Sequence, residues 1–192
     1  MTLAELDEIV SARPSLRGFL FGYLNEYKLR RMWFSGSQIR DIVLYDNHDR
    51  RHKGDMSFTY KGVPVAVECK ALQTSTVRQV NGQYSGKFQC DASDRRKVHL
   101  PGGEELETTC LVVGEFDLLA VGLFEFGQQW RFAFAANSDL PRSKYSRYTP
   151  EQRRRLLAAT MAITWPLCAP FRDEPFAVLD AIVRRKKNRA HG

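Results

Sequence analysis

The chain has 192 residues and a formal net charge of +7 at pH 7, with 43% hydrophobic and 27% charged residues. This length and composition predict one globular domain and argue against a disordered or fibrous protein. No apolar run is long enough to span a bilayer, and the acidic start of the chain differs from a signal peptide. Four cysteines far apart in the sequence predict reduced thiols and a cytoplasmic protein. The positive charge suits a polyanionic partner such as a nucleic acid.

The N-terminal part of the chain has the spacing of apolar residues that is typical of helices. It predicts a short helix over residues 3–10 and a longer one from Pro14 to about Arg31. Glu26 lies near the end of the second helix, where the simplest interpretation is an exposed side chain paired with Arg30 one turn further on.

The segment from Gly54 to Lys70 predicts a β-hairpin with two chemically different faces. β-Branched and aromatic residues fill 56–60 and 63–67, and Lys61-Gly62 between them forms a short turn. In that register Asp55 lies directly opposite Glu68, and the alternation of side chains separates the two faces. The apolar face carries Met56, Phe58, Tyr60, Val63, Val65 and Val67, and the other carries Asp55, Ser57, Thr59, Pro64, Ala66, Glu68 and Lys70. We therefore expect the first face on a core and the second to place two carboxylates near an ammonium group.

Two opposed carboxylates need a compensating charge. Side chains that face each other across a hairpin have Cβ atoms about 5 Å apart, where like charges destabilise the pair. A hard divalent cation such as Mg²⁺ prefers carboxylate oxygens and keeps waters of its own. Such an ion can activate a water for attack on a phosphate, and Lys70 is placed to orient that water or neutralise phosphate charge. The alternative is a solvated strand face on an edge hairpin.

Asp55, followed by Glu68-Cys69-Lys70 at the end of the next strand, resembles the PD-(D/E)XK signature of the restriction-endonuclease-like nuclease superfamily. Gly54 stands where that family often has proline. The resemblance implies an α/β fold in which helices flank a central mixed β-sheet, and we expect this single domain to cover residues 1–183.

The same resemblance implies roles for individual residues. Asp55 and Glu68 would bind Mg²⁺, or Mn²⁺ in its place, and the backbone carbonyl of Cys69 would complete the site. Lys70 would assist the attacking water. In some members of the family a glutamate of the first core helix reaches the metal, and Glu26 is the candidate for that catalytic role here.

The rest of the chain predicts further strands and two more helices. In the family a helix follows the strand that carries E-x-K, but here Asn81-Gly82 predicts that this helix is short or missing. Strands are expected over residues 39–45, 84–90, 106–113, 118–126 and 129–136, and helices from Thr149 to about 163 and over about 174–185.

Two basic segments are candidates for contacts with a nucleic-acid backbone. The first is a loop with Arg95, Arg96 and Lys97, and the second has Arg142, Lys144 and Arg147 interleaved with Tyr145 and Tyr148. A turn with self-paired charges and a solvated loop over tucked aromatics are the respective alternatives. The basic tail, residues 184–192, is expected to be disordered and to act as a loose DNA-binding arm.

These features predict a Mg²⁺-dependent DNA endonuclease of the restriction, defence or DNA-processing type, with a homodimer as one way of cutting both strands. The alternative is a non-catalytic nucleic-acid-binding module that retains the nuclease fold. RNA as the substrate also stays open.

Overall fold

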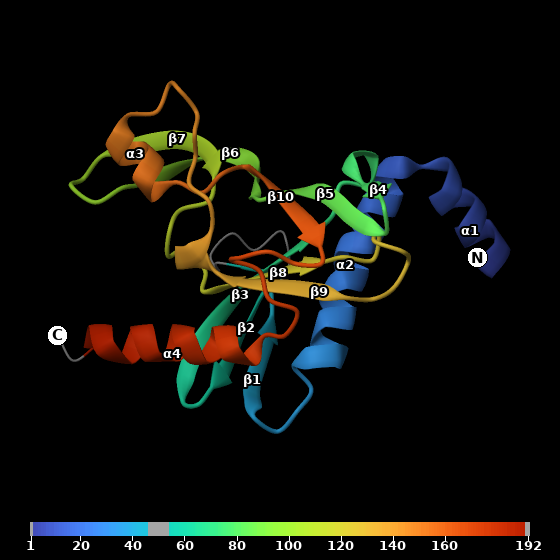
Figure 1. Cartoon of the computed structure of the whole chain (residues 1–192), viewed down its shortest axis with the longest axis horizontal. Coiled ribbons are helices and arrows are strands. Elements are labelled where there is room, and N and C mark those ends of the chain that lie inside the picture. The colour runs from blue at the N-terminus through green and yellow to red at the C-terminus, as the bar shows by residue number, and fades with distance from the viewer. Residues whose placement is uncertain (1, 46–53, 191–192) are drawn as a thin grey trace.

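The computed structural model describes residues 2–45 and 54–190 (Figure 1). The chain begins with two helices, α1 (Leu3–Ala12) and α2 (Pro14–Trp33), close to the predicted bounds. A reciprocal capping box starts α1: Glu5 N–H donates to the hydroxyl of Thr2, and Thr2 N–H donates to the carboxylate of Glu5. None of the described helices combines the length and the apolar content that crossing a bilayer requires.

A five-stranded mixed sheet forms the centre of the fold. Its strands lie in the order β1-β2-β3-β8-β9, and β3 and β8 are parallel whereas the other neighbours are antiparallel. The bounds are Ile39–Leu44 for β1, Met56–Tyr60 for β2, Val63–Ala71 for β3, Leu118–Gly122 for β8 and Phe132–Ala136 for β9. This arrangement confirms the predicted α/β fold with a central mixed sheet and helices packed against it.

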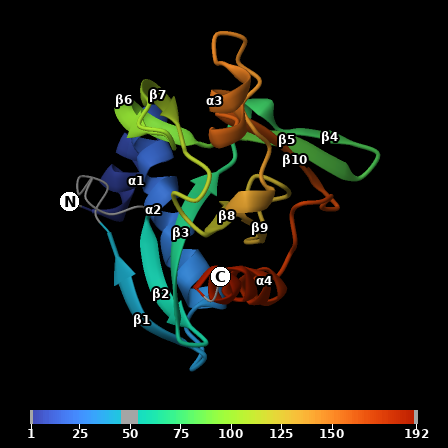
Figure 2. The same ribbon diagram turned by 90° about the vertical axis from the view of Figure 1, so that its left-hand side faces the viewer.

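One face of this sheet packs on helices. The buried side chains of β2 and β3, such as Phe58 and Val65, share a core with Leu29 of α2 and Leu179 of α4 (Phe176–Ala190). Figure 2 shows α4 lying across the end of the β2–β3 hairpin. The predicted apolar face of the hairpin is thus the face that meets the helices.

A second β-layer covers the opposite face. It contains a three-stranded sheet in the order β10-β5-β4 and the separate β6–β7 hairpin. Phe88 of β5 and Met161 of β10 pack there with Leu119 and Val121 of the central sheet. The strand bounds are Arg78–Val80 for β4, Gln83–Gln89 for β5, Asp91–His99 for β6, Glu105–Cys110 for β7 and Thr160–Trp165 for β10. As predicted, no long helix follows β3: a short 3₁₀ turn, η1 (Thr74–Thr76), leads from it to β4.

The predicted helix from Thr149 to about 163 is wrong in its second half. Helix α3 covers only Pro150–Arg155, and the chain then becomes extended and forms β10. Leu156 and Leu157 are fully buried and form bridges to Val112 and Arg142. Further on, β10 pairs with β5 along its whole length. Tertiary pairing therefore overrides the local helical preference of this segment.

The strands predicted over 106–113, 118–126 and 129–136 are shorter, since β7, β8 and β9 cover Glu105–Cys110, Leu118–Gly122 and Phe132–Ala136. The prediction of a disordered tail is also wrong as far as the described residues go, because α4 continues to Ala190. Lys186 explains part of this extension: its Nζ lies 2.6 Å from Asp117 Oδ2 and donates to Pro64 O at 2.8 Å. Residues 191 and 192 lie outside the described part.

Candidate active site

The β2–β3 hairpin has the predicted register. Tyr60 pairs with Val63, and Met56 pairs with Val67, so the next position brings Asp55 alongside Glu68. Asp55 N–H donates to Val67 O at 2.8 Å, and Cys69 N–H donates to Asp55 Oδ2 at 2.6 Å. The backbone of β3 therefore holds both the main chain and the carboxylate of Asp55.

Gly54 is required by the way the chain enters β2. Its φ is +81°, and a Cβ at this position would lie 2.5 Å from Val67 O. A proline has φ fixed near about −65° and could not adopt this conformation. Glycine at this position thus has a local cause, because the tight approach to β3 leaves no room for a side chain.

Glu68 and Lys70 lie on the same face of β3, two residues apart. Lys70 Nζ is 2.6 Å from Glu68 Oε1, and the two side chains are 22% and 11% exposed, respectively. This ion pair is more shielded from solvent than the Lys61–Asp180 pair near the turn of the same hairpin, which has the same 2.6 Å separation but side chains 55% and 42% exposed. The site therefore holds a shielded charge pair beside a second carboxylate.

The electrostatics of the cluster show an excess of negative charge. Burial raises the pKa of Asp55 to about 7, with a further contribution from the charge of Glu68, against the opposing effects of Lys70 and the Cys69 N–H. Burial acts to lower the pKa of Lys70, but the negative charges of Glu68 and Asp55 have the larger combined effect. The pKa of Lys70 is therefore raised above its usual range. Lys70 therefore stays protonated, and its single charge does not neutralise the acids around it.

Helix α2 places Glu26 beside this cluster. Burial raises the pKa of Glu26 to about 7, and the charge of Glu68 raises it further whereas Lys70 lowers it. The expected alternative, an ion pair with Arg30, is absent among the ion pairs of the described residues. The structure thus brings Glu26 within electrostatic reach of Asp55, Glu68 and Lys70, although its catalytic role stays a prediction.

The donor set suits a hard divalent cation. Carboxylate oxygens of Asp55 and Glu68 are the ligands that Mg²⁺ prefers, and the excess negative charge gives a cation a favourable site. Within residues 2–45 and 54–190, no group of three or more His, Cys, Asp and Glu side chains is arranged to hold a metal ion. The predicted set, two carboxylates with the carbonyl of Cys69, would be completed by water.

A cavity of about 330 Å³ lies at the Lys70 end of β3, between α2 and the ends of β3 and β8. Arg17, Phe21 and Asn25 of α2 line it, one helical turn apart, together with Ala71 and Gly122. These residues carry no functional motif in the sequence, although their i, i+4, i+8 spacing places them on one side of a helix. The cavity is next in sequence to two residues of the cluster, because its lining residues Asn25 and Ala71 directly precede Glu26 and directly follow Lys70, respectively.

The first basic segment is not a loop. Arg95, Arg96 and Lys97 lie in strand β6. Arg96 is paired with Glu115 at 2.5 Å, and Lys97 lies 3.7 Å from Glu105. Arg95 is exposed and lines a cavity instead. Arg96 is therefore in a shielded ion pair and Lys97 in an exposed one, whereas Arg95 faces the cavity.

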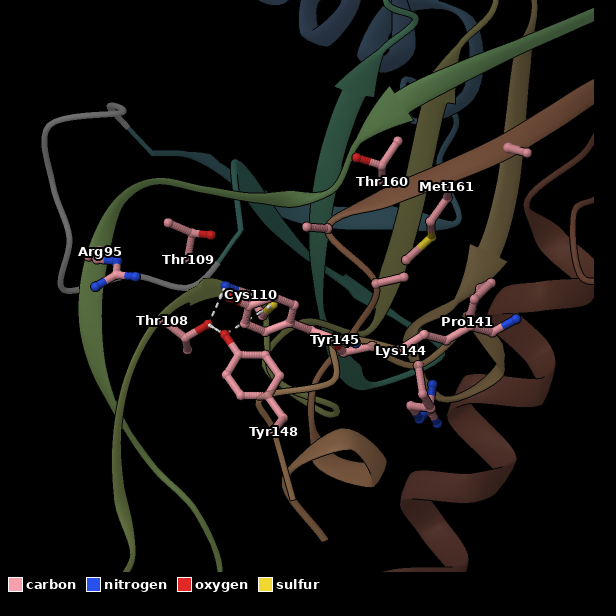
Figure 3. Close-up of a pocket in the computed structure, with 15 residues that line it drawn as sticks. Arg95, Thr108, Thr109, Cys110, Pro141, Lys144, Tyr145, Tyr148, Thr160 and Met161 are labelled. Carbon is pink, nitrogen blue, oxygen red and sulfur yellow. Dashed lines mark hydrogen bonds between the residues drawn. The ribbon is translucent and has the colours of Figure 1, made fainter. Parts of the chain in front are cut away.

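The second basic segment meets the first at this cavity, which has a volume of about 580 Å³. Arg95 lines it together with Arg142, Lys144, Tyr145 and Tyr148, and we call these five residues the tyrosine pocket (Figure 3).

Arg147 is exposed and does not line the tyrosine pocket. Thr108 and Met161 also line the cavity but were not predicted, because they belong to segments with no functional signal of their own. The pairing of two distant basic segments follows from the tertiary fold.

Comparisons with known proteins do not assign the chain to a family. No protein-family model matches it, and neither does any curated protein. Among solved structures, a bacterial homing endonuclease, I-Ssp6803I, is similar to 74% of this chain and 87% of its own, with 12% sequence identity and a TM-score of 0.31. A likeness at this level carries no weight for the activity, which depends on the side chains of the site itself.

Proposed function

We propose that this chain is a metal-dependent nuclease that hydrolyses phosphodiester bonds in DNA, with Mg²⁺ as its cofactor and Mn²⁺ as a substitute. One observation carries the proposal: the carboxylate of Asp55, directly before β2, accepts the Cys69 N–H of β3 at 2.6 Å, and on that strand Lys70 Nζ lies 2.6 Å from Glu68 Oε1. A strand face that carried only solvated charges would not need a carboxylate held by the backbone and shielded from water.

The residues of the site divide the chemistry among them. Asp55 and Glu68, with the carbonyl of Cys69, would hold the ion, which supplies a Lewis acid and lowers the pKa of bound water. Lys70 remains an ammonium group and donates hydrogen bonds, so it can orient the attacking water and stabilise negative charge on the phosphate. A cation cannot accept the proton of that water. Glu26 is the neighbouring carboxylate suited to that step.

The cations of the second layer would contact the DNA backbone. Arg95, Arg142 and Lys144 meet at the tyrosine pocket, and Arg147 and Lys97 are exposed near the same segments. Arg96 is already paired with Glu115 and contributes less. Phosphate contacts of this kind position a protein on DNA without selecting sequence, which suits an enzyme of the restriction, defence or DNA-processing type.

We also propose that two copies associate through α1 and α2. Ten large apolar side chains on these helices are exposed by 36–86%: Leu3, Leu6, Ile9, Leu16, Phe19, Leu20, Tyr23, Leu24, Tyr27 and Met32. All charged side chains of α1 are acidic, whereas those of α2 are basic apart from Glu26. Packing α1 of one copy on α2 of the other would bury the apolar face and pair opposite charges twice, as a twofold interface requires.

Light scattering of the purified chain tests this dimer. Phe19→Glu, at a side chain 70% exposed, should give the mass of a monomer. Val80→Glu is the matched control, because Val80 is 66% exposed on β4, away from both helices. A wild-type monomer, or a dimer that both variants leave intact, would contradict the proposed interface.

Plasmid cleavage tests the nuclease proposal. The wild type should nick or linearise plasmid DNA with Mg²⁺ and not with EDTA. Asp55→Ala, Glu68→Ala and Lys70→Ala should lower the rate by at least about 100-fold while DNA binding in EDTA is largely kept.

Asp180→Asn and Lys61→Ala are matched controls, since they remove an acid and an amine of the exposed pair near the other end of the same hairpin. Both should cleave like the wild type. Cleavage at the wild-type rate by the active-site variants would remove these residues from the mechanism. DNA binding without any cleavage would favour the alternative, a binding module that retains the fold.

A further inference from the structure

The tyrosine pocket has an uncompensated positive charge. Its walls come from the β6–β7 hairpin, the segment 141–148 and the start of β10, and the described residues that line it include three cations and no Asp or Glu. In the described part of the chain, neither Arg95 nor Lys144 forms an ion pair, whereas Arg96 next in sequence is paired with Glu115. A cavity with this lining attracts an anion.

Arg142 adds a third positive charge that is already oriented. Its guanidinium donates to the carbonyl oxygens of Leu140 and of Ser138, the latter at 2.7 Å. These bonds go to neutral groups and do not cancel the charge of Arg142. The charge of Asp139 also acts on Arg142, but Asp139 is paired with Arg185 at 2.9 Å. Arg142 is partly buried, and a charge held in place beside a cavity loses little conformational entropy when a ligand binds.

The pocket also offers an aromatic surface. The rings of Tyr145 and Tyr148 lie edge to face, with centroids 5.1 Å apart and planes at 78°. A hydrogen bond of 2.7 Å between the hydroxyl groups of Tyr148 and Thr108 holds the second ring, while the side chain of Tyr145 is 49% exposed. Figure 3 shows the two rings between Arg95 on one side and Lys144 on the other. An exposed ring backed by a fixed one is a stacking platform for a base.

We propose that the tyrosine pocket binds one unpaired nucleotide of a single DNA strand, with the base stacked on Tyr145 and the flanking phosphates near Arg95 and Lys144. A volume of about 580 Å³ is adequate for one nucleotide. The base must have one face free of its neighbour, which a flexible single strand permits, whereas an interior base of a duplex must first leave the stack. This inference rests on the proposed function in that the ligand is part of the same DNA substrate.

The pocket lies on the same side of the central sheet as the candidate active site. Met161 of β10, which also lines this cavity, pairs with Phe88 of β5. Phe88 in turn forms a bridge to Leu72, two residues after Lys70. Glu68 and Lys70 project from that same face of β3. A single strand held in the pocket can therefore continue toward the carboxylates without crossing the sheet.

The test measures binding without cleavage. A labelled single-stranded oligonucleotide of about 12 nucleotides and a duplex of the same sequence are titrated with the full chain in EDTA, followed by fluorescence anisotropy. Tyr145→Ala should weaken single-strand binding by about tenfold or more, since base stacking on one ring has about that effect. The same variant should change duplex binding by less than about twofold.

Three variants separate the contributions of ring and charge. Tyr145→Phe keeps the stacking surface and should bind within about twofold of the wild type. Lys144→Ala should weaken binding and reduce its dependence on salt, whereas Lys61→Ala, an exposed lysine outside the pocket, should reduce both less. Thymidine monophosphate should compete with the single strand more effectively than inorganic phosphate. Thermal melting checks that each variant is folded.

Each of three results would overturn the inference. Tyr145→Ala could bind single strands like the wild type, it could lose single-strand and duplex binding equally, or inorganic phosphate could compete as well as the nucleotide. Because the titration uses EDTA, it measures binding independently of cleavage. Binding that depends on the pocket, without any Mg²⁺-dependent cleavage, would refute the proposed nuclease activity and support the proposed role of the pocket. Mg²⁺-dependent cleavage, together with single-strand binding that Tyr145→Ala leaves unchanged, would support the nuclease activity and refute the role of the pocket.

Discussion

Replacing Asp55 by asparagine should stabilise the folded chain above pH 7 when divalent ions are absent. Burial and the charge of Glu68 raise the pKa of Asp55 from 3.8 to about 7, although Lys70 and the Cys69 N–H oppose them. Between these pH values the folded chain binds more protons than the unfolded chain, so its stability falls as the pH rises. Asparagine stays neutral and its side-chain oxygen can still accept the Cys69 N–H.

The magnitude follows from this shift in the pKa of Asp55. One pKa unit corresponds to about 1.4 kcal/mol, so a rise from 3.8 to about 7 corresponds to up to about 4 kcal/mol in the free energy of unfolding. Glu26 has a pKa of about 7 and titrates in the same range, so it keeps part of the pH dependence in the variant. We expect Asp55→Asn to exceed the wild type by about 2–4 kcal/mol at about pH 8, and to match it within about 1 kcal/mol at about pH 4.

Urea unfolding in EDTA at these two pH values measures the difference. Asp180→Asn is the control with the opposite sign, because the hydrogen bond from Lys61 lowers the pKa of Asp180 and its charge favours the folded state above that pKa. An Asp55→Asn variant no more stable than the wild type at about pH 8 would refute the claim that burial and the charge of Glu68 disfavour an ionised Asp55 in the folded chain.

Three further substitutions test how the fold positions the site. Gly54→Pro should lower cleavage, and urea unfolding should show a loss of about 1–3 kcal/mol, because a φ of +81° excludes proline; a fully active variant would contradict this. Gly122→Ala would place a Cβ 1.8 Å from Asn25 Oδ1 and displace α2, so stability should fall by about 1–3 kcal/mol, whereas unchanged stability would show that α2 adjusts freely. Leu179→Ala should lower the free energy of unfolding by about 2–5 kcal/mol, because Leu179 of α4 is fully buried against the sheet; a loss below about 1 kcal/mol would argue against this packing.

The hairpin was predictable because local rules decide it. Lys61-Gly62 supplies the positive φ values that a tight turn needs, with 49° at Lys61 and 74° at Gly62. Strict alternation then assigns each side chain of β2 and β3 to a face, and the burial of Met56 and Val67 agrees with that assignment. The position of Asp55 beside Glu68 follows from the turn and the alternation alone.

Other parts depend on contacts that the sequence does not display. The segment after Arg155 has residues that favour a helix locally, but pairing of Thr160–Trp165 with β5 makes it a strand. The meeting of Arg95 and Lys144 in one cavity arises from the packing of β6 against a segment far along the chain. Similarly, nothing in the spacing of α2 indicates that Glu26 turns toward the hairpin rather than toward Arg30.

Diffraction from crystals grown with Mn²⁺ tests the central claim most directly, since anomalous scattering locates the ion. We predict one strong anomalous peak bound by carboxylate oxygens of both Asp55 and Glu68, and its loss in Asp55→Asn crystals. The absence of a peak at saturating Mn²⁺, or a peak that touches neither carboxylate, would contradict the assignment of this site as the catalytic centre of a metal-dependent nuclease.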